Sequence, residues 1–156
     1  KREEAQATLI EAISRSPKNI LRQMELGNIS LSLNDSMTAE MSFRRAVFLA
    51  KYSCYNTADV YLKHLESLAR LSDNGPLLPR QKDTFDSTLK KVHESFFDDP
   101  DNKAKAYNYE IDIYIADNDK STAKQIFESW LSEVKSGSAT APSKQQSSVY
   151  AKSFGS

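Results

Sequence analysis

A pattern of small and apolar side chains recurs in this chain after 34 residues. Small residues at matching positions of two helices allow a paired antiparallel helix to approach closely, so the pattern predicts stacked helical hairpins. The dipeptide Leu26-Gly27 lies between the two copies. Repeats of this kind usually form surfaces that bind another protein and are seldom catalytic. The paired positions are Ala5 and Ala39, Leu9 and Phe43, Ala12 and Ala46, and Pro17 and Lys51.

The length and charge of the chain narrow the classes of function. With 156 residues the chain is long enough to bury its own core and is one domain by length alone. Lys plus Arg and Asp plus Glu both number 21, so the formal net charge is zero. We therefore expect no general attraction to nucleic acid or to an anionic membrane. Only four glycines and five prolines occur, which favours helices over a protein rich in tight turns.

The single cysteine, Cys54, excludes an intramolecular disulfide and a cysteine zinc site. This fits a reducing, cytoplasmic setting. No stretch of about 18 apolar residues is present, so the sequence predicts no membrane span. The first residues, Lys1-Arg2-Glu3-Glu4, open inside an amphipathic pattern without Met, and we interpret the chain as a fragment of a longer protein.

Apolar periodicity predicts about seven helices. The helix around residues 5–13 ends before Pro17, and residues 73–79, which contain Gly75 and two prolines, form the clearest break. Asp35 or Ser36 is expected to cap the helix that buries Met41, Ala46, Val47 and Ala50. We expect one helical domain over residues 1–135 and a flexible Ser-rich tail over 136–156. The remaining predicted helices span residues 19–33, 37–52, 58–71, 80–97, 102–116 and 120–134.

Residues 12–28, 39–47 and 51–53 resemble the tetratricopeptide portion of bacterial response regulators, in which a receiver domain precedes helical repeats. The resemblance covers roughly the first 70 residues. It implies an all-α, right-handed superhelix of antiparallel hairpins. It also implies a non-catalytic interaction module that binds a partner protein, such as a histidine kinase or another response regulator, under control of the receiver. The alternatives are a homodimerisation domain of such a regulator and a free-standing adaptor in envelope or pilus assembly.

The resemblance also suggests a partner-binding surface around Asn28. In tetratricopeptide domains the first helix of each pair lines the concave face, and an Asn after the small residue often binds a peptide backbone. An amide suits this role because it donates and accepts at once. Packing of the same stripe against a neighbouring helix is an equally strong interpretation. The proposed partner-binding residues are Leu21, Met24, Asn28, Leu31 and Ser32.

No other group of residues strongly predicts a catalytic or ligand-binding site, and we expect no cofactor, metal ion or catalytic residue. Asp117, Asp119, Ser121 and Glu128 match ligand positions of a calcium loop, but Thr122 stands where the sharp turn needs Gly, so helix capping is the better interpretation.

His64, His93 and Cys54 lack flanking motifs and are interpreted as structural or surface residues. The aromatic residues of the last two predicted helices, interleaved with acidic ones, indicate core filling and self-association, not nucleic-acid stacking. They are Tyr107, Tyr109, Tyr114 and Trp130.

Overall fold

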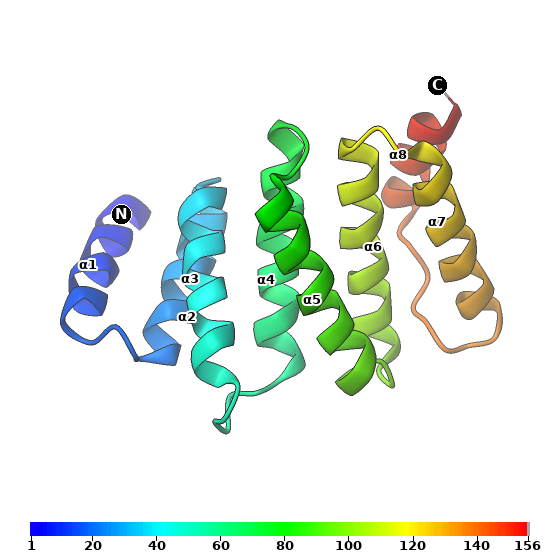
Figure 1. Cartoon of the computed structure of the whole chain (residues 1–156). Coiled ribbons are helices and arrows are strands. Elements are labelled where there is room, and N and C mark those ends of the chain that lie inside the picture. The colour runs from blue at the N-terminus through cyan, green and yellow to red at the C-terminus, as the bar shows by residue number, and fades with distance from the viewer. Residues whose placement is uncertain (156) are drawn as a thin grey trace. The chain divides into compact units, whose positions relative to one another are not determined.

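The computed structural model describes residues 1–155, and within them the chain is all-helical, which confirms the predicted all-α fold (Figure 1). It divides into two compact units, Lys1–Leu71 and a second from Ser72 onward. The division falls beside the predicted break at 73–79, where one continuous domain had been expected. The α-helices are α1 Arg2–Arg15, α2 Ile20–Ser32, α3 Ser36–Ala50, α4 Ala58–Leu71, α5 Pro79–Ser95, α6 Pro100–Ala116, α7 Lys120–Lys135 and α8 Lys144–Gly155; η1, a 3₁₀ turn, spans Ser72–Asn74.

Local capping explains where several helices begin. The side chain of Asn19 accepts a hydrogen bond from the backbone N–H of Arg22 and starts α2. Asp35 does the same for α3 through the N–H of Thr38, as the sequence predicted. α6 begins with Asp99 as the cap and Pro100 at the first helical position, where a missing N–H costs nothing.

The first unit is organised by a close approach of α2 and α3. Gly27 on α2 faces the ring of Phe43 on α3, and a Cβ atom at Gly27 would lie 2.5 Å from that ring. Phe43 is fully buried with Leu31 and Ala39, and Met24 packs against this cluster. Gly27 therefore allows α3 to approach α2 closely, and the side chain that occupies the space beside it is the ring of Phe43.

A second cluster joins α3 to α4. Ala46 and Ala50 pack with Val60, and Met24 and Ile20 of α2 cover them. The small alanines let α4 approach α3 closely, as expected from the repeat pattern.

Beside this cluster, a polar pair is buried between α3 and α4. His64 Nε2 lies 2.9 Å from Glu40 Oε2, and the His64 side chain is 1% exposed. A buried polar group retains a hydrogen-bond partner because an unsatisfied one costs free energy. The pair explains why an acid and a histidine are tolerated in an otherwise apolar interface.

α1 is held less firmly than the other helices of this unit. None of its residues is fully buried. Gln6 Nε2 donates to Ser30 Oγ at 3.0 Å and to Asp35 Oδ2 at 2.9 Å, which ties α1 to the end of α2 and to the cap of α3. α1 is thus an edge helix fixed by polar bonds and a half-buried apolar stripe.

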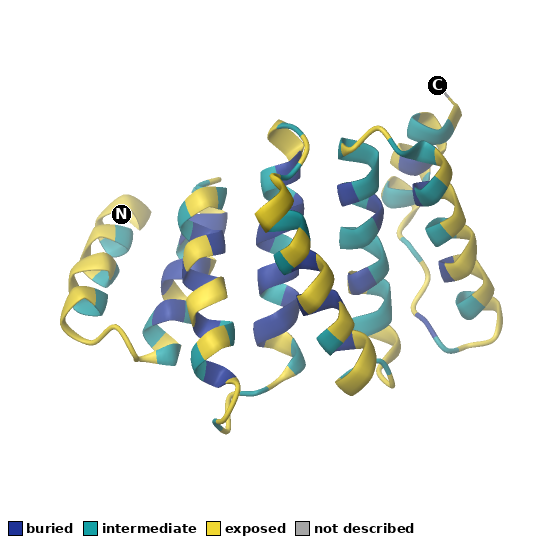
Figure 2. Ribbon diagram, viewed as in Figure 1, coloured by how far each residue is buried: buried dark blue, intermediate teal, exposed yellow. Residues whose placement is uncertain are grey.

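The second unit contains an aromatic core cluster between α6, α7 and α8, and α5 buries Phe85, Leu89 and Val92. Trp130 is buried at the centre of this cluster, and its Nε1 donates to the carbonyl oxygen of Thr140 at 2.8 Å. Figure 2 shows the buried positions along the inner faces of the helices. Tyr107 stacks on Trp130, in agreement with the core-filling interpretation of these aromatics. The buried residues of this cluster are Ile111, Ala123, Trp130, Ala139 and Tyr150.

The last segment differs from the expected flexible tail. Residues 144–155 form α8, and Tyr150 on this helix is 2% exposed. Its ring packs against Phe127, and Phe154 joins the same aromatic group. The polar composition of the segment concealed this packing, because two aromatic side chains one turn apart are enough to anchor a short helix to an existing core.

Candidate functional site

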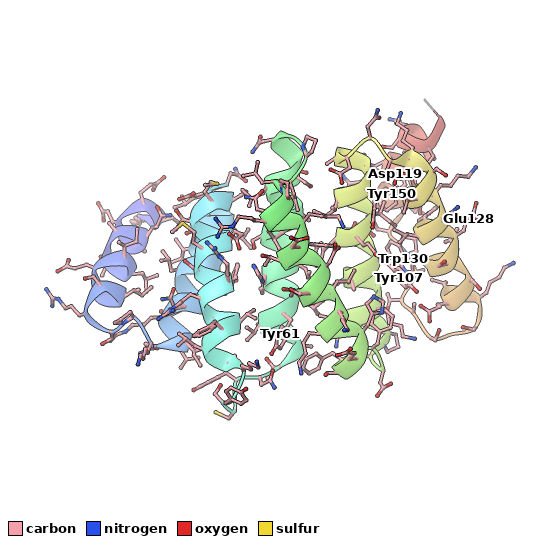
Figure 3. All side chains as sticks on the ribbon, viewed as in Figure 1. Tyr61, Tyr107, Asp119, Glu128, Trp130 and Tyr150 are labelled. Carbon is pink, nitrogen blue, oxygen red and sulfur yellow. The ribbon has the colours of Figure 1, made fainter. Side chains whose placement is uncertain are left out.

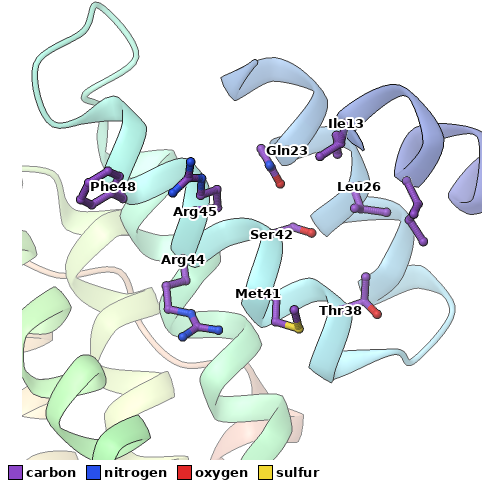
Figure 4. A pocket seen from close by; sticks show the side chains of 10 residues that line it. Ile13, Gln23, Leu26, Thr38, Met41, Ser42, Arg44, Arg45 and Phe48 are labelled. Atoms are coloured by element: carbon purple, nitrogen blue, oxygen red, sulfur yellow. The ribbon is translucent and has the colours of Figure 1, made fainter. Parts of the chain in front are cut away.

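An open groove of about 680 Å³ lies in the first unit, with walls from α1 and α3 and a floor from α2 (Figure 4). Its lining is mainly apolar, and the polar groups on it are two arginines and three small or amide side chains. A concave, largely apolar surface with few polar groups is the usual form of a binding site. The lining residues are Ile10, Ile13, Gln23, Leu26, Thr38, Met41, Ser42, Arg44, Arg45 and Phe48.

The α3 wall of the groove carries a stripe of exposed apolar side chains. Met37, Met41 and Phe48 are 62%, 57% and 71% exposed. Their spacing of i, i+4 and i+11 places them on one face of the helix. The prediction that Met41 is buried is therefore wrong. Ala39, Phe43 and their neighbours fill the core face, and Met41 points away from it.

Two arginines lie on the same helix beside this stripe. The Arg45 guanidinium lies over the Phe48 ring, 5.6 Å from its centroid. Arg44 Nε is 3.3 Å from Glu40 Oε2, and half of the Arg44 side chain remains exposed. Arginine over an aromatic face is a favourable cation–π arrangement that holds both groups in place. The lining includes no carboxylate, so the groove has a positive rim.

The floor of the groove is rigid. Leu26 and Gln23 of α2 are buried, and Gln23 Nε2 donates to the carbonyl oxygen of Pro17 at 3.2 Å. The opposite wall is formed by Ile10 and Ile13 of α1, the helix without fully buried residues. A fixed floor and a lightly attached wall allow the width of the groove to adjust.

The five residues predicted from the family resemblance are not brought together as one surface. Leu31 is buried in the core, and Met24 is half-buried against both core clusters. Leu21, Asn28 and Ser32 are exposed on α2, and the Ser32 hydroxyl donates to the carbonyl oxygen of Ile29. None of the five lines the groove. The sequence did not predict the groove because Met41 was assigned to the core and Phe48 was not singled out.

Of the residues considered for metal or acid–base chemistry, Asp119 and His93 have structural contacts, whereas Glu128 and Cys54 are exposed. Asp119 caps α7 by accepting from the N–H and the hydroxyl of Thr122, while Glu128 lies exposed farther along the helix (Figure 3). His93 stacks on Phe97 with centroids 4.0 Å apart, and partial burial lowers its pKa although Glu133 opposes this. Cys54 is exposed in the loop between α3 and α4.

A polar network fixes α7 to α6 in the second unit. Lys103 Nζ lies 3.0 Å from Glu133 Oε1, and the Tyr107 hydroxyl donates to Glu133 Oε2. Burial alone would raise the pKa of Glu133, but these two donors outweigh it and lower the pKa. Burial, together with the neighbouring Glu133, raises the pKa of Tyr107. The network keeps Glu133 ionised and Tyr107 protonated, and both of these states preserve the hydrogen bonds that join α6 to α7.

α8 is attached to α6 through Tyr150. Its hydroxyl donates to Asn108 Oδ1, and Asp112 lies one turn farther along α6 (Figure 3 labels Tyr150). Burial raises the pKa of Asp112 from 3.8 to about 7, the charge of Asp73 adds to this, and hydrogen bonding with Tyr150 opposes it. The attachment of α8 therefore contains a carboxyl group that titrates near neutral pH.

Two further findings bear on function. Within residues 1–155 no helix combines the length and apolarity that crossing a membrane requires. The same part of the chain contains no group of three or more His, Cys, Asp or Glu side chains arranged to hold a metal ion.

No model of a known protein family, no curated protein and no solved structure matches the chain.

Proposed function

We propose that the chain is a non-catalytic interaction module that binds a partner protein in the groove between α1 and α3. The observation that carries the proposal is the exposed apolar stripe of α3. Phe48 and Met41 are more than half exposed, although the same helix already buries a complete apolar face against α2 and α4. An apolar patch of this kind marks an interaction site when it adjoins a groove.

The chemistry of the groove supports binding over catalysis. Its polar members are Thr38, Ser42 and Gln23 beside the two arginines, and a methionine offers a flexible surface that adapts to a partner. An acyl- or phosphoryl-transfer site would need a nucleophile held beside a base. The buried histidine of this unit, His64, is instead paired with Glu40 inside the core.

The signalling context belongs to the same proposal. It rests on the resemblance of residues 12–28, 39–47 and 51–53 to the repeat region of response regulators. In that context the module binds a histidine kinase or another response regulator when the attached receiver is active.

Site-specific photo-crosslinking in cells tests the binding surface. A photoreactive phenylalanine analogue at position 48 is expected to form one dominant adduct with a partner protein. The same analogue at Leu131, an exposed apolar position on α7, is the matched control and should give none. Equal adducts from both positions, or none from position 48, would contradict the proposal.

Homodimerisation through the same face is the alternative, and electrostatics disfavours a symmetric form of it. A twofold contact brings the same patch of both copies into one interface, so the arginines of both copies would share a lining that contains no carboxylate. Light scattering after size exclusion distinguishes the two functions. A stable dimer that the substitution Phe48→Ser converts to monomer would favour dimerisation.

A further inference from the structure

We propose that the groove between α1 and α3 takes an acidic amphipathic helix, with its apolar face against Met41 and Phe48 and its carboxylates on Arg44 and Arg45. This inference deepens the proposed function and rests on it. The shape and the charge of the groove both favour one class of ligand, a short acidic helix.

The shape of the groove favours a helical ligand. The part of α3 that lines it runs from Thr38 to Phe48, about 15 Å of helix at 1.5 Å per residue. Three turns of a partner helix match this length. The first unit is built from helices alone, so it offers no strand edge on which an extended peptide could be added, and an apolar groove between helices is the setting in which helix-in-groove binding occurs.

Charge selects an acidic ligand. Arg44 and Arg45 are both exposed and belong to the groove lining, which contains no carboxylate. Arg44 also contacts the buried Glu40, so Arg45 is the arginine without a carboxylate beside it in the lining. Arg45 is held over Phe48, so its guanidinium stands directly beside the apolar stripe. A fixed planar cation next to an apolar anchor suits a carboxylate that lies one turn away from a buried leucine or phenylalanine on the partner.

The two walls explain how one groove accepts such a helix. Ile10 of α1 is half exposed and lines the groove together with Met41 of α3. α1 is attached by the bonds of Gln6 and by a half-buried apolar stripe, and it has no fully buried residue, so an outward shift of α1 leaves the Gly27–Phe43 contact between α2 and α3 in place. The ligand helix would thus lie between α1 and α3 as an additional helix over α2.

The test uses the full chain and three synthetic helices of about 14 residues. All carry leucine at i, i+3, i+4 and i+7 spacing, and the remaining positions are rich in glutamate, in glutamine or in lysine. The glutamate helix is expected to bind at least tenfold more tightly than the lysine helix, and its affinity should fall as salt is raised. Amide and methyl NMR shifts should concentrate at Ile10, Ile13 and Met41.

Matched variants separate the contribution of the arginine charges from that of the apolar stripe. The double substitution Arg44→Glu with Arg45→Glu should reverse the preference toward the lysine helix, and Phe48→Ser should weaken all three helices. Lys124→Glu and Leu131→Ser, both exposed on α7, are the controls and should change nothing. Circular dichroism melting of each variant verifies that the fold is retained.

The outcomes separate this inference from the proposed function. Equal binding of the three helices would overturn the acidic preference and leave docking in the groove intact. Failure of every helix, with a crosslinked partner still found at position 48, would overturn the helical ligand alone. Failure of both the helices and the crosslink would remove the proposed function as well.

Discussion

The ring of Phe43 lies against the backbone of Gly27, where a Cβ atom would approach it to 2.5 Å. Phe43 is fully buried, so the ring is enclosed by protein and cannot turn toward solvent without unpacking. This contact sets the separation of α2 and α3. Even the addition of one methyl group at Gly27 is therefore expected to lower the stability of the first unit.

Gly27→Ala should therefore destabilise the chain. Overpacking typically costs about 1–3 kcal/mol, and the better helix propensity of alanine offsets up to about 1 kcal/mol of that. Urea unfolding followed by circular dichroism measures the difference. Phe43→Leu in the same chain should restore part of the lost stability, because the shorter side chain makes room for the added methyl group. A stable Gly27→Ala variant would show that the helices separate freely.

Ala46→Leu tests the second interface. Ala46 is fully buried against Ala50 and Val60, and a larger side chain would force α3 and α4 apart at a cost of about 1–3 kcal/mol. Asn28→Ala is the control, since Asn28 is exposed on α2 and should leave the melting temperature nearly unchanged. The reverse result, a neutral Ala46→Leu beside a destabilising Asn28→Ala, would mean that the inner and outer faces are assigned wrongly.

Tyr150→Ala should release α8. The substitution removes the buried ring between Phe127 and Phe154 and the hydroxyl that donates to Asn108. Limited proteolysis should then cut residues 144–155 much faster than in the unsubstituted chain. Tyr150→Phe keeps the ring and loses only the hydrogen bond, so it should cost about 1 kcal/mol and protect the segment almost fully. Equal cleavage of all three proteins would show that α8 is not held by Tyr150.

Asp112→Asn should remove a pH dependence of stability. In the folded chain the pKa of Asp112 is raised from 3.8 to about 7 by burial, so between these values the unfolded chain has lost a proton that the folded chain retains. Stability contributed by this group therefore falls as pH rises from about 4 to 7 and then levels off. The Asn variant should be more stable than the parent at pH 8 and equal to it near pH 4. Melting curves of both proteins across this range provide the comparison, in which all other titrating groups cancel.

Asp119→Ala should lower the melting temperature by the same amount in calcium and in EDTA. Asp119 accepts two hydrogen bonds from Thr122 at the start of α7, and the substitution removes this cap. Millimolar calcium that raised the melting temperature of the parent by several degrees, with no effect of magnesium, would instead identify the acidic turn as a cation site.

Features that depend on neighbouring residues were predictable from the sequence. Pro17, Asp35 and Asp119 mark helix boundaries because capping and proline act within one turn of the chain. The predicted helix at 58–71 agrees with α4 at both ends. Gly75 and the two prolines likewise predicted the break at 73–79, but they did not show that the chain divides beside it into two units.

Features that depend on distant partners were not predictable. Apolar periodicity counts Met41 as a core residue, and only packing shows that Phe43 and Ala39 already fill that core. The pairing of His64 with Glu40 joins residues 24 positions apart. α8 was missed because its composition is polar, and its stability comes from a surface on α6 and α7 that its own sequence does not reveal.

The Gly27–Phe43 contact also determines how α3 is rotated about its own axis. A helix with apolar residues on two opposite sides gains comparable free energy from burying either side, so burial alone leaves its orientation undecided. Only one rotation places an aromatic ring over the single position of α2 that lacks a Cβ atom. The outward presentation of Met41 and Phe48 is thus fixed by a glycine outside the groove. A variant of Gly27 that still folds should present a different face of α3 to a partner.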